Sequence, residues 1–154
     1  MIFQNRIEAG EKLAAAVVKV VKGKGIVLGI PRGGVVVAEI VAEKLGWPLD
    51  VLPAKKISAP GNPELAIGAR VKPTPLQIKG LNVILADDGV ATGLTIEAGI
   101  NWLKRKRAKK IIVAVPVAAK DSAARLKTLA DEWICLHEAD DLYAVGQFYK
   151  EFGQ

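Results

Sequence analysis

Short aliphatic runs alternate along the chain with longer segments in which apolar residues recur every three or four positions. A short apolar run bounded by turn residues predicts a buried strand, and a periodic segment predicts a helix with one buried face. Strands that alternate with helices predict an α/β fold with a mostly parallel central sheet and helices on both of its faces. We expect helices within 1–22, 35–45, 95–103 and 121–129, and strands at 26–30, 50–54, 83–86, 110–117 and 131–136.

Several helix positions can be assigned from residue type. In the first helix, Phe3, Ile7 and Leu13 fall on the expected buried face. Thr and Asp are frequent N-cap residues, so we expect the third helix to begin at Thr95 and the fourth at Asp121.

The stretch from Val83 to Thr95 carries the most specific chemistry. Its apolar run ends at two adjacent carboxylates, Asp87 and Asp88, and a turn of small residues with two glycines and two threonines follows. The end of a strand and the start of a helix therefore meet at the edge where open α/β sheets bind ligands. Free N–H groups at a helix N-terminus favour a phosphate, whereas the carboxylates suit hydroxyl donors or a divalent cation.

The two adjacent acids need an explanation. Two like charges ~4 Å apart repel by about 4 kcal/mol at an effective dielectric constant near 20, and a helix dipole returns only ~0.3–1 kcal/mol per charge. A ligand with a phosphate at one end and hydroxyls or Mg²⁺ at the other would balance Asp87 and Asp88. The alternative is an ordinary strand-to-helix turn with incidental acids.

This stretch resembles the diphosphoribose-binding signature of type I phosphoribosyltransferases. The resemblance implies a Rossmann-like three-layer α/β/α fold with a minimal hood, and carboxylates at Asp87 and Asp88 that hold the ribose hydroxyls and Mg²⁺, directly or through water. It also implies that the turn wraps the 5′-phosphate. The substrate-binding residues expected here are Asp87, Asp88, Gly89, Val90, Ala91, Thr92, Gly93, Leu94 and Thr95.

A second glycine turn follows the strand at 26–30. In this turn Arg32 can bind a phosphate with two hydrogen bonds, and Gly33 and Gly34 let the backbone come close to a ligand. In the resemblance this is the pyrophosphate-binding loop, where family members often hold a strained or cis peptide. The alternative is a tight turn with a surface arginine.

A third candidate segment, residues 55–70, contains two adjacent lysines and a loop rich in helix-breaking residues at 59–63. Lys55 or Lys56 is placed to meet a diphosphate, and we expect a mobile loop between short edge strands that could close over the site. Solvated lysines before a turn are the alternative. The sequence here resembles a phosphoribosyltransferase-like group of bacteria and archaea. Members of that group have a long helical insertion after the Gly-Ala at 68–69, which a short Pro-rich connection replaces in this chain.

The bulk properties limit the remaining possibilities. With 154 residues, half of them apolar and a quarter charged, the chain is expected to form one domain, 1–154, of globular type. A single cysteine, Cys135, with a single histidine makes neither a disulfide nor a zinc site. No apolar run reaches the ~18 residues of a membrane span and no signal peptide is recognisable, so we expect a cytoplasmic protein without a membrane partner.

The net charge of +6 is concentrated in the basic segment 104–110. We interpret it as a solvated helix end rather than a nucleic-acid patch, because no aromatic series or RNA-binding motif accompanies it. Aromatic residues gather near the C-terminus, where Tyr143, Phe148 or Tyr149 serves either packing, which we favour, or stacking on a base.

The resemblance implies an Mg²⁺-dependent phosphoribosyltransferase that uses phosphoribosyl diphosphate and a nitrogen acceptor, with a nucleoside monophosphate as product and a homodimer as the expected assembly. In that enzyme Asp87, Asp88, Lys55 and Lys56 would be catalytic. The alternative, favoured by the missing insertion, is a non-catalytic regulatory protein that binds the same ligand or a nucleotide.

Overall fold

A central sheet of five parallel strands forms the middle layer of the molecule. The computed structural model describes residues 1–153, without the side chain of residue 64. Every strand pair of this sheet is parallel, in the order β2-β1-β5-β6-β7. The strands are β1 (Ile26–Gly29), β2 (Leu49–Val51), β5 (Asn82–Ala86), β6 (Lys110–Ala119) and β7 (Glu132–Ala139).

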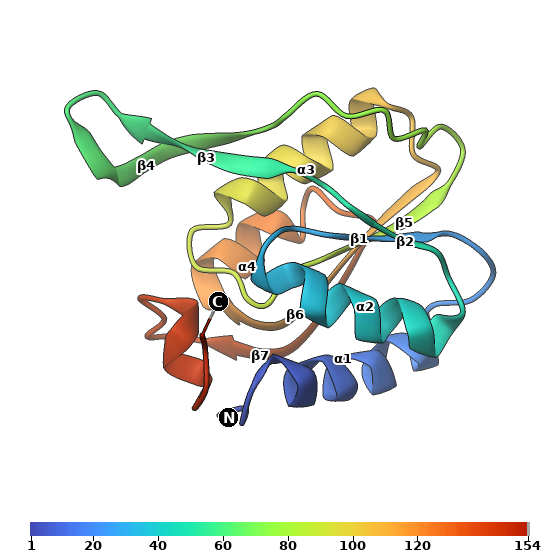
Figure 1. Cartoon of the computed structure of the whole chain (residues 1–154), viewed down its shortest axis with the longest axis horizontal. Coiled ribbons are helices and arrows are strands. Elements are labelled where there is room, and N and C mark those ends of the chain that lie inside the picture. Colours follow the sequence, from blue (N-terminus) through green and yellow to red (C-terminus); the bar gives the residue numbers. More distant parts are fainter. Residues whose placement is uncertain (154) are drawn as a thin grey trace.

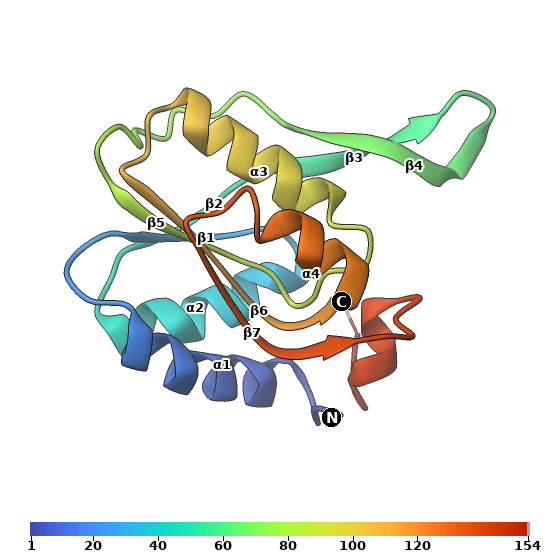
Figure 2. The same cartoon turned by 180° about the vertical axis from the view of Figure 1, so that it is seen from behind.

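Helices cover both faces of the sheet, as the alternation of apolar segments predicts. Helices α1 (Arg6–Val20) and α2 (Gly33–Leu45) lie on one face, and α3 (Leu94–Arg105) and α4 (Lys120–Leu126) lie on the other (Figures 1 and 2). Successive strand residues point to opposite faces. On β5, Ile84 therefore packs with α1 and α2, whereas Val83 and Leu85 pack with α3 and α4.

The strand order reverses direction between β1 and β5, and this point positions the turns of interest. From β1 the chain proceeds to β2 on one side, while β5 and the strands after it lie on the other. Leu28 pairs with Leu85 and Gly29 with Ala86, so β1 and β5 end at the same level. The glycine turn after β1 and the acidic turn after β5 are therefore neighbours at a topological switch point, where open α/β sheets bind ligands.

The strands expected on both sides of residues 59–63 form a long antiparallel hairpin, and the mobile loop expected between them is a tight turn. Strand β3 (Ala54–Ala59) pairs with β4 (Asn62–Val71), and only Pro60 and Gly61 form the turn between them. Ala54 and Val71 at its base pack on the core beside α3. The far end projects from the body (Figure 1). The breaker residues thus make a tight turn rather than a loop.

Three expectations about helix ends are wrong. Helix α1 begins at Arg6 with Asn5 as its capping residue, so Phe3 lies outside the helix and Ile7 is 56% exposed. The N-cap of α3 is Gly93 in the left-handed region, which puts Thr95 inside the helix. The N-cap of α4 is Ala119, and Asp121 lies inside the helix, where its carboxylate accepts a hydrogen bond from the Ser122 N–H.

The two chain ends are joined beside β7. Phe3 and Tyr149 form an isolated parallel bridge, in which the Phe3 N–H donates to the Phe148 carbonyl at 2.8 Å. The tail carries a short 3₁₀ turn, η1 (Val145–Phe148), and runs beside the start of the chain in Figure 1. This packing explains why Phe3 is fully buried without being helical. Within residues 1–153, none of the helices has the length and apolarity needed to cross a bilayer.

The core beneath α3 should respond sharply to truncation. Ile100 is fully buried, so Ile100→Ala is expected to lower the free energy of unfolding by about 2–5 kcal/mol. Ile67→Ala on the hairpin is a matched control, because Ile67 is 60% exposed and should change stability by less than about 0.5 kcal/mol. Urea unfolding followed by circular dichroism measures both. Equal losses in the two variants would contradict this placement of the core.

Candidate ligand-binding site

A cavity of about 420 Å³ opens at the carboxyl ends of β1 and β5. It brings together most of the residues that the sequence singles out, from two distant segments of the chain. The hairpin contributes Lys55 and Lys56, and the turn after β5 contributes all of the residues from Asp87 to Thr95. The cavity is completed by Ile30, Pro31, Ala54, Ile96 and Val145.

The two acids have different surroundings. Asp88 is 9% exposed, and its Oδ2 accepts a hydrogen bond from Arg6 Nε at 2.9 Å in a buried ion pair. Asp87 Oδ1 accepts only the neighbouring Asp88 N–H, at 2.8 Å, among the contacts of the described residues. Burial, and after it the negative charge of Asp88, raises the pKa of the Asp87 carboxyl well above its ordinary value. The nearby Lys56 ammonium offsets only part of this effect on the pKa.

Arg6 is the functional neighbour that sequence reasoning missed. The sequence left both carboxylates without a protein partner, but the first residue of α1 supplies one for Asp88. The two residues are 82 positions apart, and Arg6 stands in no recognisable motif. No local signal could have identified the pair.

The glycine turn after β1 packs directly beneath the acids. A Cβ atom on Gly33 would overlap the Asp88 carboxylate and lie 2.6 Å from Arg6 Nε, and one on Gly34 would lie 2.7 Å from Asp87 Oδ1. Glycine is thus required here by close approach rather than by a positive φ. The peptide bond between Pro31 and Arg32 is cis.

Of this turn, only Pro31 lines the cavity. Arg32 is exposed at the N-cap of α2, and Gly33 and Gly34 are buried beside the cavity. Their predicted contact with a diphosphate therefore depends on the N–H groups at the start of α2 and on the reach of the Arg32 side chain.

Two helices begin at or beside the site without side-chain caps. Neither Arg32, the N-cap of α2, nor Gly93, the N-cap of α3, makes a capping hydrogen bond with its side chain. In α1, by contrast, Asn5 Oδ1 accepts from the Glu8 N–H at 2.9 Å. The first N–H groups of a helix have no intrahelical partners and carry a partial positive charge. The two uncapped ends therefore suit anionic groups.

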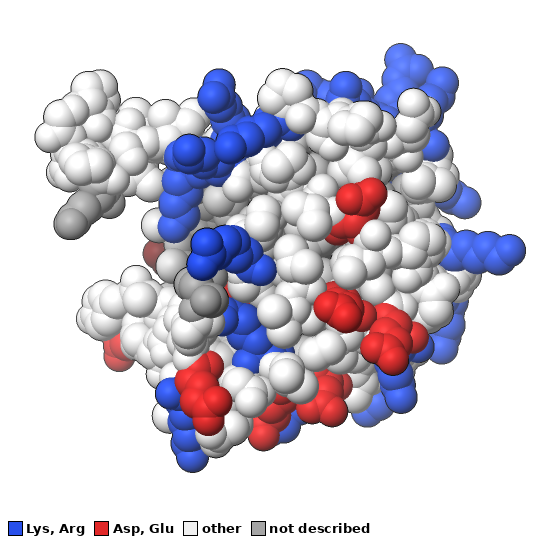
Figure 3. Space-filling model, in the orientation of Figure 1, with Lys and Arg blue, Asp and Glu red and all other residues white. Residues whose placement is uncertain are grey.

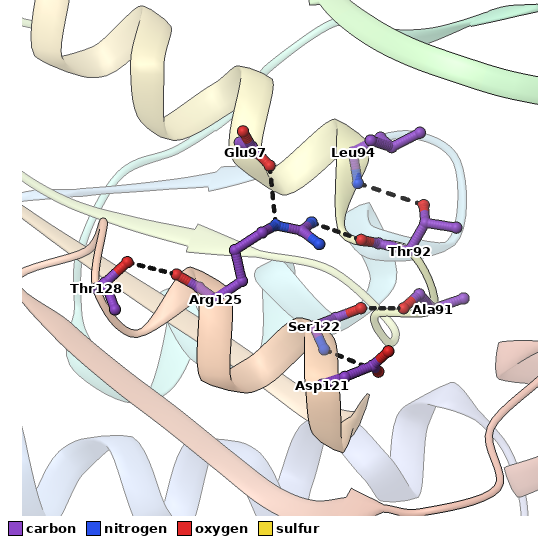
Figure 4. A network of polar contacts seen from close by, with 8 residues as sticks. All are labelled: Ala91, Thr92, Leu94, Glu97, Asp121, Ser122, Arg125 and Thr128. Atoms are coloured by element: carbon purple, nitrogen blue, oxygen red, sulfur yellow. Dashed lines mark hydrogen bonds and ion pairs between the residues drawn. The ribbon is translucent and has the colours of Figure 1, made fainter.

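Helix α4 holds the turn after β5 from behind (Figure 4). Ser122 Oγ donates to the Ala91 carbonyl at 2.5 Å, and Arg125 Nη2 donates to the Thr92 carbonyl at 2.6 Å. A trans peptide directs its C=O and N–H in opposite directions. The N–H groups of Thr92 and Gly93 are consequently directed away from α4, toward the cavity that these two residues line. Arg125 is itself oriented by Glu97, whose carboxylate lies 3.1 Å from Nε.

The aromatic tail packs against the site rather than opening into it. The Tyr149 hydroxyl donates to the Asp88 carbonyl at 2.6 Å, and Phe148 packs near His137. Tyr143 is 85% exposed, and none of the three aromatic residues lines the cavity. The tail residue that does is Val145, which the sequence did not single out.

Two exposed lysines on β3, Lys55 and Lys56, also line the cavity. Of the two, Lys56 lies near enough to Asp87 for its charge to lower the pKa of that carboxyl. Figure 3 shows Lys and Arg side chains gathered where the hairpin joins the body, while the projecting end shows none among the described residues. The basic segment 104–110, at the far end of α3, contributes nothing to the lining of the cavity.

The residues present fit a magnesium ion. Mg²⁺ prefers oxygen ligands and is usually held by one or two carboxylates together with water and substrate phosphates. Asp87 and Asp88 supply hard carboxylate oxygens. Burial first, and the charge of Asp88 second, raise the pKa of Asp87, and a bound cation would favour its ionised form. No group of three or more metal-ligating side chains occurs among the described residues, so a bound ligand would have to complete the shell. Cys135 is not an alternative centre, since burial raises its pKa to about 12.

Comparison with known proteins identifies relatives of the chain. The family model for the phosphoribosyl transferase domain matches residues 2–151. A Mycobacterium tuberculosis protein named as a phosphoribosyl transferase is 33% identical over 195 aligned positions, which cover 99% of this chain and 44% of that protein. The chain thus spans less than half the length of this curated relative. Because the alignment is longer than the 154 residues of the chain, the relative contains residues that this chain lacks.

Solved structures share the fold. TT1426 from Thermus thermophilus superimposes with a TM-score of 0.85 and 36% identity, covering 100% of this chain and 93% of that chain. A purine phosphoribosyltransferase from Pyrococcus horikoshii superimposes with a TM-score of 0.61 at 22% identity, covering 85% and 80% of the two chains. The parallel sheet and its flanking helices are therefore those of the type I phosphoribosyltransferase fold, as predicted.

The close approach at Gly34 can be tested by adding one methyl group. In Gly34→Ala the new Cβ would press on Asp87 and on the Ala86 carbonyl, so we expect a loss of about 1–3 kcal/mol in the free energy of unfolding. Gly68→Ala is the control, because no atom lies within 4 Å of its Cβ position. Urea unfolding measures the stability of both variants. If Gly34→Ala is as stable as the parent, the predicted crowding at Gly34 is wrong.

The two acids should respond oppositely to neutralisation. The native pKa of Asp87 is raised, whereas in the unfolded chain it is near ~3.9. As pH rises from that value through the raised pKa, the unfolded state loses the proton first, so stability falls. Asp87→Asn removes this loss and should be more stable than the parent at pH 8. Asp88→Asn leaves Arg6 buried without its partner and should cost about 3–5 kcal/mol.

Urea unfolding at pH 4.5 and pH 8 measures this difference. The stability of Asp87→Asn relative to the parent should grow with pH. If the parent and Asp87→Asn show the same pH dependence, Asp87 is not the destabilising carboxylate.

Proposed function

The chain belongs to the phosphoribosyl transferase family, and we propose that it binds phosphoribosyl diphosphate with Mg²⁺ and transfers the ribose 5-phosphate group to a nitrogen acceptor of the nucleobase class. One observation carries the proposal: the uncapped N-terminus of α3, the acids Asp87 and Asp88 and two lysines line one cavity at the switch point of the sheet, and the uncapped N-terminus of α2 begins beside the two acids. This set of groups matches a ligand with phosphates at both ends and hydroxyls in the middle.

The uncapped start of α3 supports a place for the 5′-phosphate. The N–H groups of Thr92 and Gly93 and the hydroxyls of Thr92 and Thr95 would hold it, since all three residues line the cavity. The ribose hydroxyls would then lie at Asp87 and Asp88. The diphosphate would extend toward Lys55, Lys56 and the turn at 32–34.

In the proposed reaction the bond between C1′ and the diphosphate oxygen breaks, and the diphosphate leaves with the electron pair. The acceptor nitrogen uses its lone pair to form the new bond at C1′ and then loses its proton to solvent. Positive charge that develops on the ribose ring would be stabilised by the carboxylates of Asp87 and Asp88. Charge on the departing diphosphate would be stabilised by Lys55, Lys56, Arg32 and the first N–H groups of α2.

Magnesium, when bound, neutralises charge on the diphosphate, and Asp87 and Asp88 are the residues that would hold it. Burial of this part of the site also favours the reaction, since electrostatic interactions are stronger where water is excluded.

A regulatory protein that binds the ligand without reacting is the second candidate. It is favoured by the short connection 72–81, which leads from β4 to β5 without a helix. Among the cavity-lining residues, neither an aromatic side chain nor a histidine is available to orient a base.

Binding is tested by titration calorimetry with phosphoribosyl diphosphate and Mg²⁺. We expect saturable binding by the parent protein and a loss of at least tenfold in affinity for Asp87→Asn, since hydrogen bonds to charged groups contribute about 1.5–3 kcal/mol each. Asp140→Asn is the control, because the Asp140 side chain is 81% exposed and forms a long ion pair with Lys120 at 3.5 Å. No binding at millimolar ligand would refute both candidate functions.

Catalysis is tested separately by incubating the protein with labelled phosphoribosyl diphosphate, Mg²⁺ and a panel of nucleobases. Release of diphosphate that depends on one base, with the matching nucleoside monophosphate as product, is the expected result. If phosphoribosyl diphosphate binds but no base in the panel causes diphosphate release, the transferase proposal is wrong and the regulatory function is supported.

A further inference from the structure

Arg6 has an unusual set of contacts for a residue at the start of a helix. Its side chain is 9% exposed and contacts two segments that are distant from it in the chain. Nε binds the Asp88 carboxylate at 2.9 Å, Nη1 donates to the Gly153 carbonyl at 2.7 Å, and Cζ lies 4.0 Å from the centre of the Phe152 ring. The guanidinium therefore links the N-terminal helix, the acidic turn and the C-terminal tail.

Stability alone does not account for this arrangement. Removing two charges from water costs several kcal/mol per ion, and an apolar pair of similar volume is often at least as stable. The pair is also incompletely satisfied, since Arg6 Nη2 is buried with no hydrogen-bond partner among the described residues. A buried charge with an unused donor is more easily explained by what it does to Asp88 than by a gain in folding energy.

The surroundings hold Asp88 at both its side chain and its backbone. Arg6 fixes one carboxylate oxygen, and the Tyr149 hydroxyl binds the carbonyl of the same residue at 2.6 Å. Gly33 leaves room for the ion pair, because a Cβ there would overlap the Asp88 carboxylate. Both supports come from the terminal segments, which are joined by the bridge between Phe3 and Tyr149.

We propose that Arg6 is a positioning residue that fixes the Asp88 carboxylate, through Oδ2, in the orientation in which its other oxygen meets a ligand hydroxyl. Tyr149 is the second support, acting on the backbone of Asp88. The inference rests on the proposed binding of phosphoribosyl diphosphate. The two acids then differ in their support. The Asp88 carboxylate is held by Arg6, whereas the Asp87 carboxylate accepts the neighbouring Asp88 N–H.

The planar guanidinium is suited to this role. Arginine presents its donors in a rigid fork, so it can bind Asp88 with Nε and the tail carbonyl with Nη1 at the same time. Lysine would supply the charge without the fork. Arg6→Lys should therefore retain part of the positioning, whereas Arg6→Gln should lose it.

A double-mutant cycle in ligand affinity tests the proposal. Affinity for phosphoribosyl diphosphate with Mg²⁺ is measured by calorimetry for the parent, Arg6→Gln, Asp88→Asn and the double variant, with urea unfolding in parallel. We expect Arg6→Gln to weaken binding by about 10- to 100-fold, the range typical for loss of a residue that orients a ligating group. In the Asp88→Asn background the same change should weaken binding by less than about threefold, because the group that Arg6 positions is already altered.

Lys12→Gln on the exposed face of α1 is the control for changes to the helix itself, since its side chain is 55% exposed and pairs only weakly with Glu8. It should bind like the parent. Tyr149→Phe keeps the buried ring and removes only the hydroxyl, so it tests the second support if Arg6→Gln does not fold. We expect it to weaken binding while the protein remains folded at the assay temperature.

The outcomes separate this inference from the proposed function. A parent protein that does not bind refutes the proposed function and the inference with it. A parent that binds, with Arg6→Gln binding equally well, refutes the inference alone. An effect of Arg6→Gln that persists undiminished in the Asp88→Asn background also refutes it, because Arg6 would then act by a route other than Asp88. If Arg6→Gln does not fold, unchanged binding by both Tyr149→Phe and Arg6→Lys refutes it.

Discussion

The pairing of β1 with β5 places two turns in one small volume at the edge of the sheet. Gly29 and Ala86 are register partners, so the chain leaves both strands at the same level. The acidic turn brings two carboxylates to this point, and the other turn can pass beneath them only if it has no side chains there. Gly33 and Gly34 meet that requirement, and they allow α2 to begin directly under the acids.

Acidic, basic and partially charged backbone groups gather around the two turns. The two carboxylates and the uncapped N-terminus of α3 line the cavity, the uncapped N-terminus of α2 begins beside the acids, and the hairpin adds Lys55 and Lys56 to the lining. One acid is paired internally with Arg6, and the other has a raised pKa that reflects its burial and its charged neighbour. Such a site holds negative charge that the fold itself does not fully balance, which is common where a ligand completes the balance.

Elements remote from the cavity contribute through the backbone. Ser122 and Arg125 on α4 hold two carbonyls of the turn after β5, and this leaves the opposite N–H groups directed away from α4. The terminal segments act on Asp88 in a comparable way, through Arg6 and Tyr149. The turn after β5 is therefore held by contacts from α1, α4 and the C-terminal tail, whereas the lysines come from a hairpin whose far end projects from the body (Figure 1).

The sequence by itself determined the features that depend on neighbouring residues. The apolar period of each segment predicted the strands and helices, because burial of a strand or helix face requires that spacing. The order of a strand, Asp87–Asp88, a Gly/Thr turn and a helix predicted where a ligand would bind, since all of these groups lie within 13 residues of one another. Only tertiary structure decided that Arg6 pairs with Asp88, that Val145 rather than an aromatic residue lines the cavity, and that the loop at 59–63 is a hairpin turn. These features depend on contacts between segments that are far apart in the chain and on which strands pair with each other. The local spacing of apolar residues does not specify such contacts or pairings.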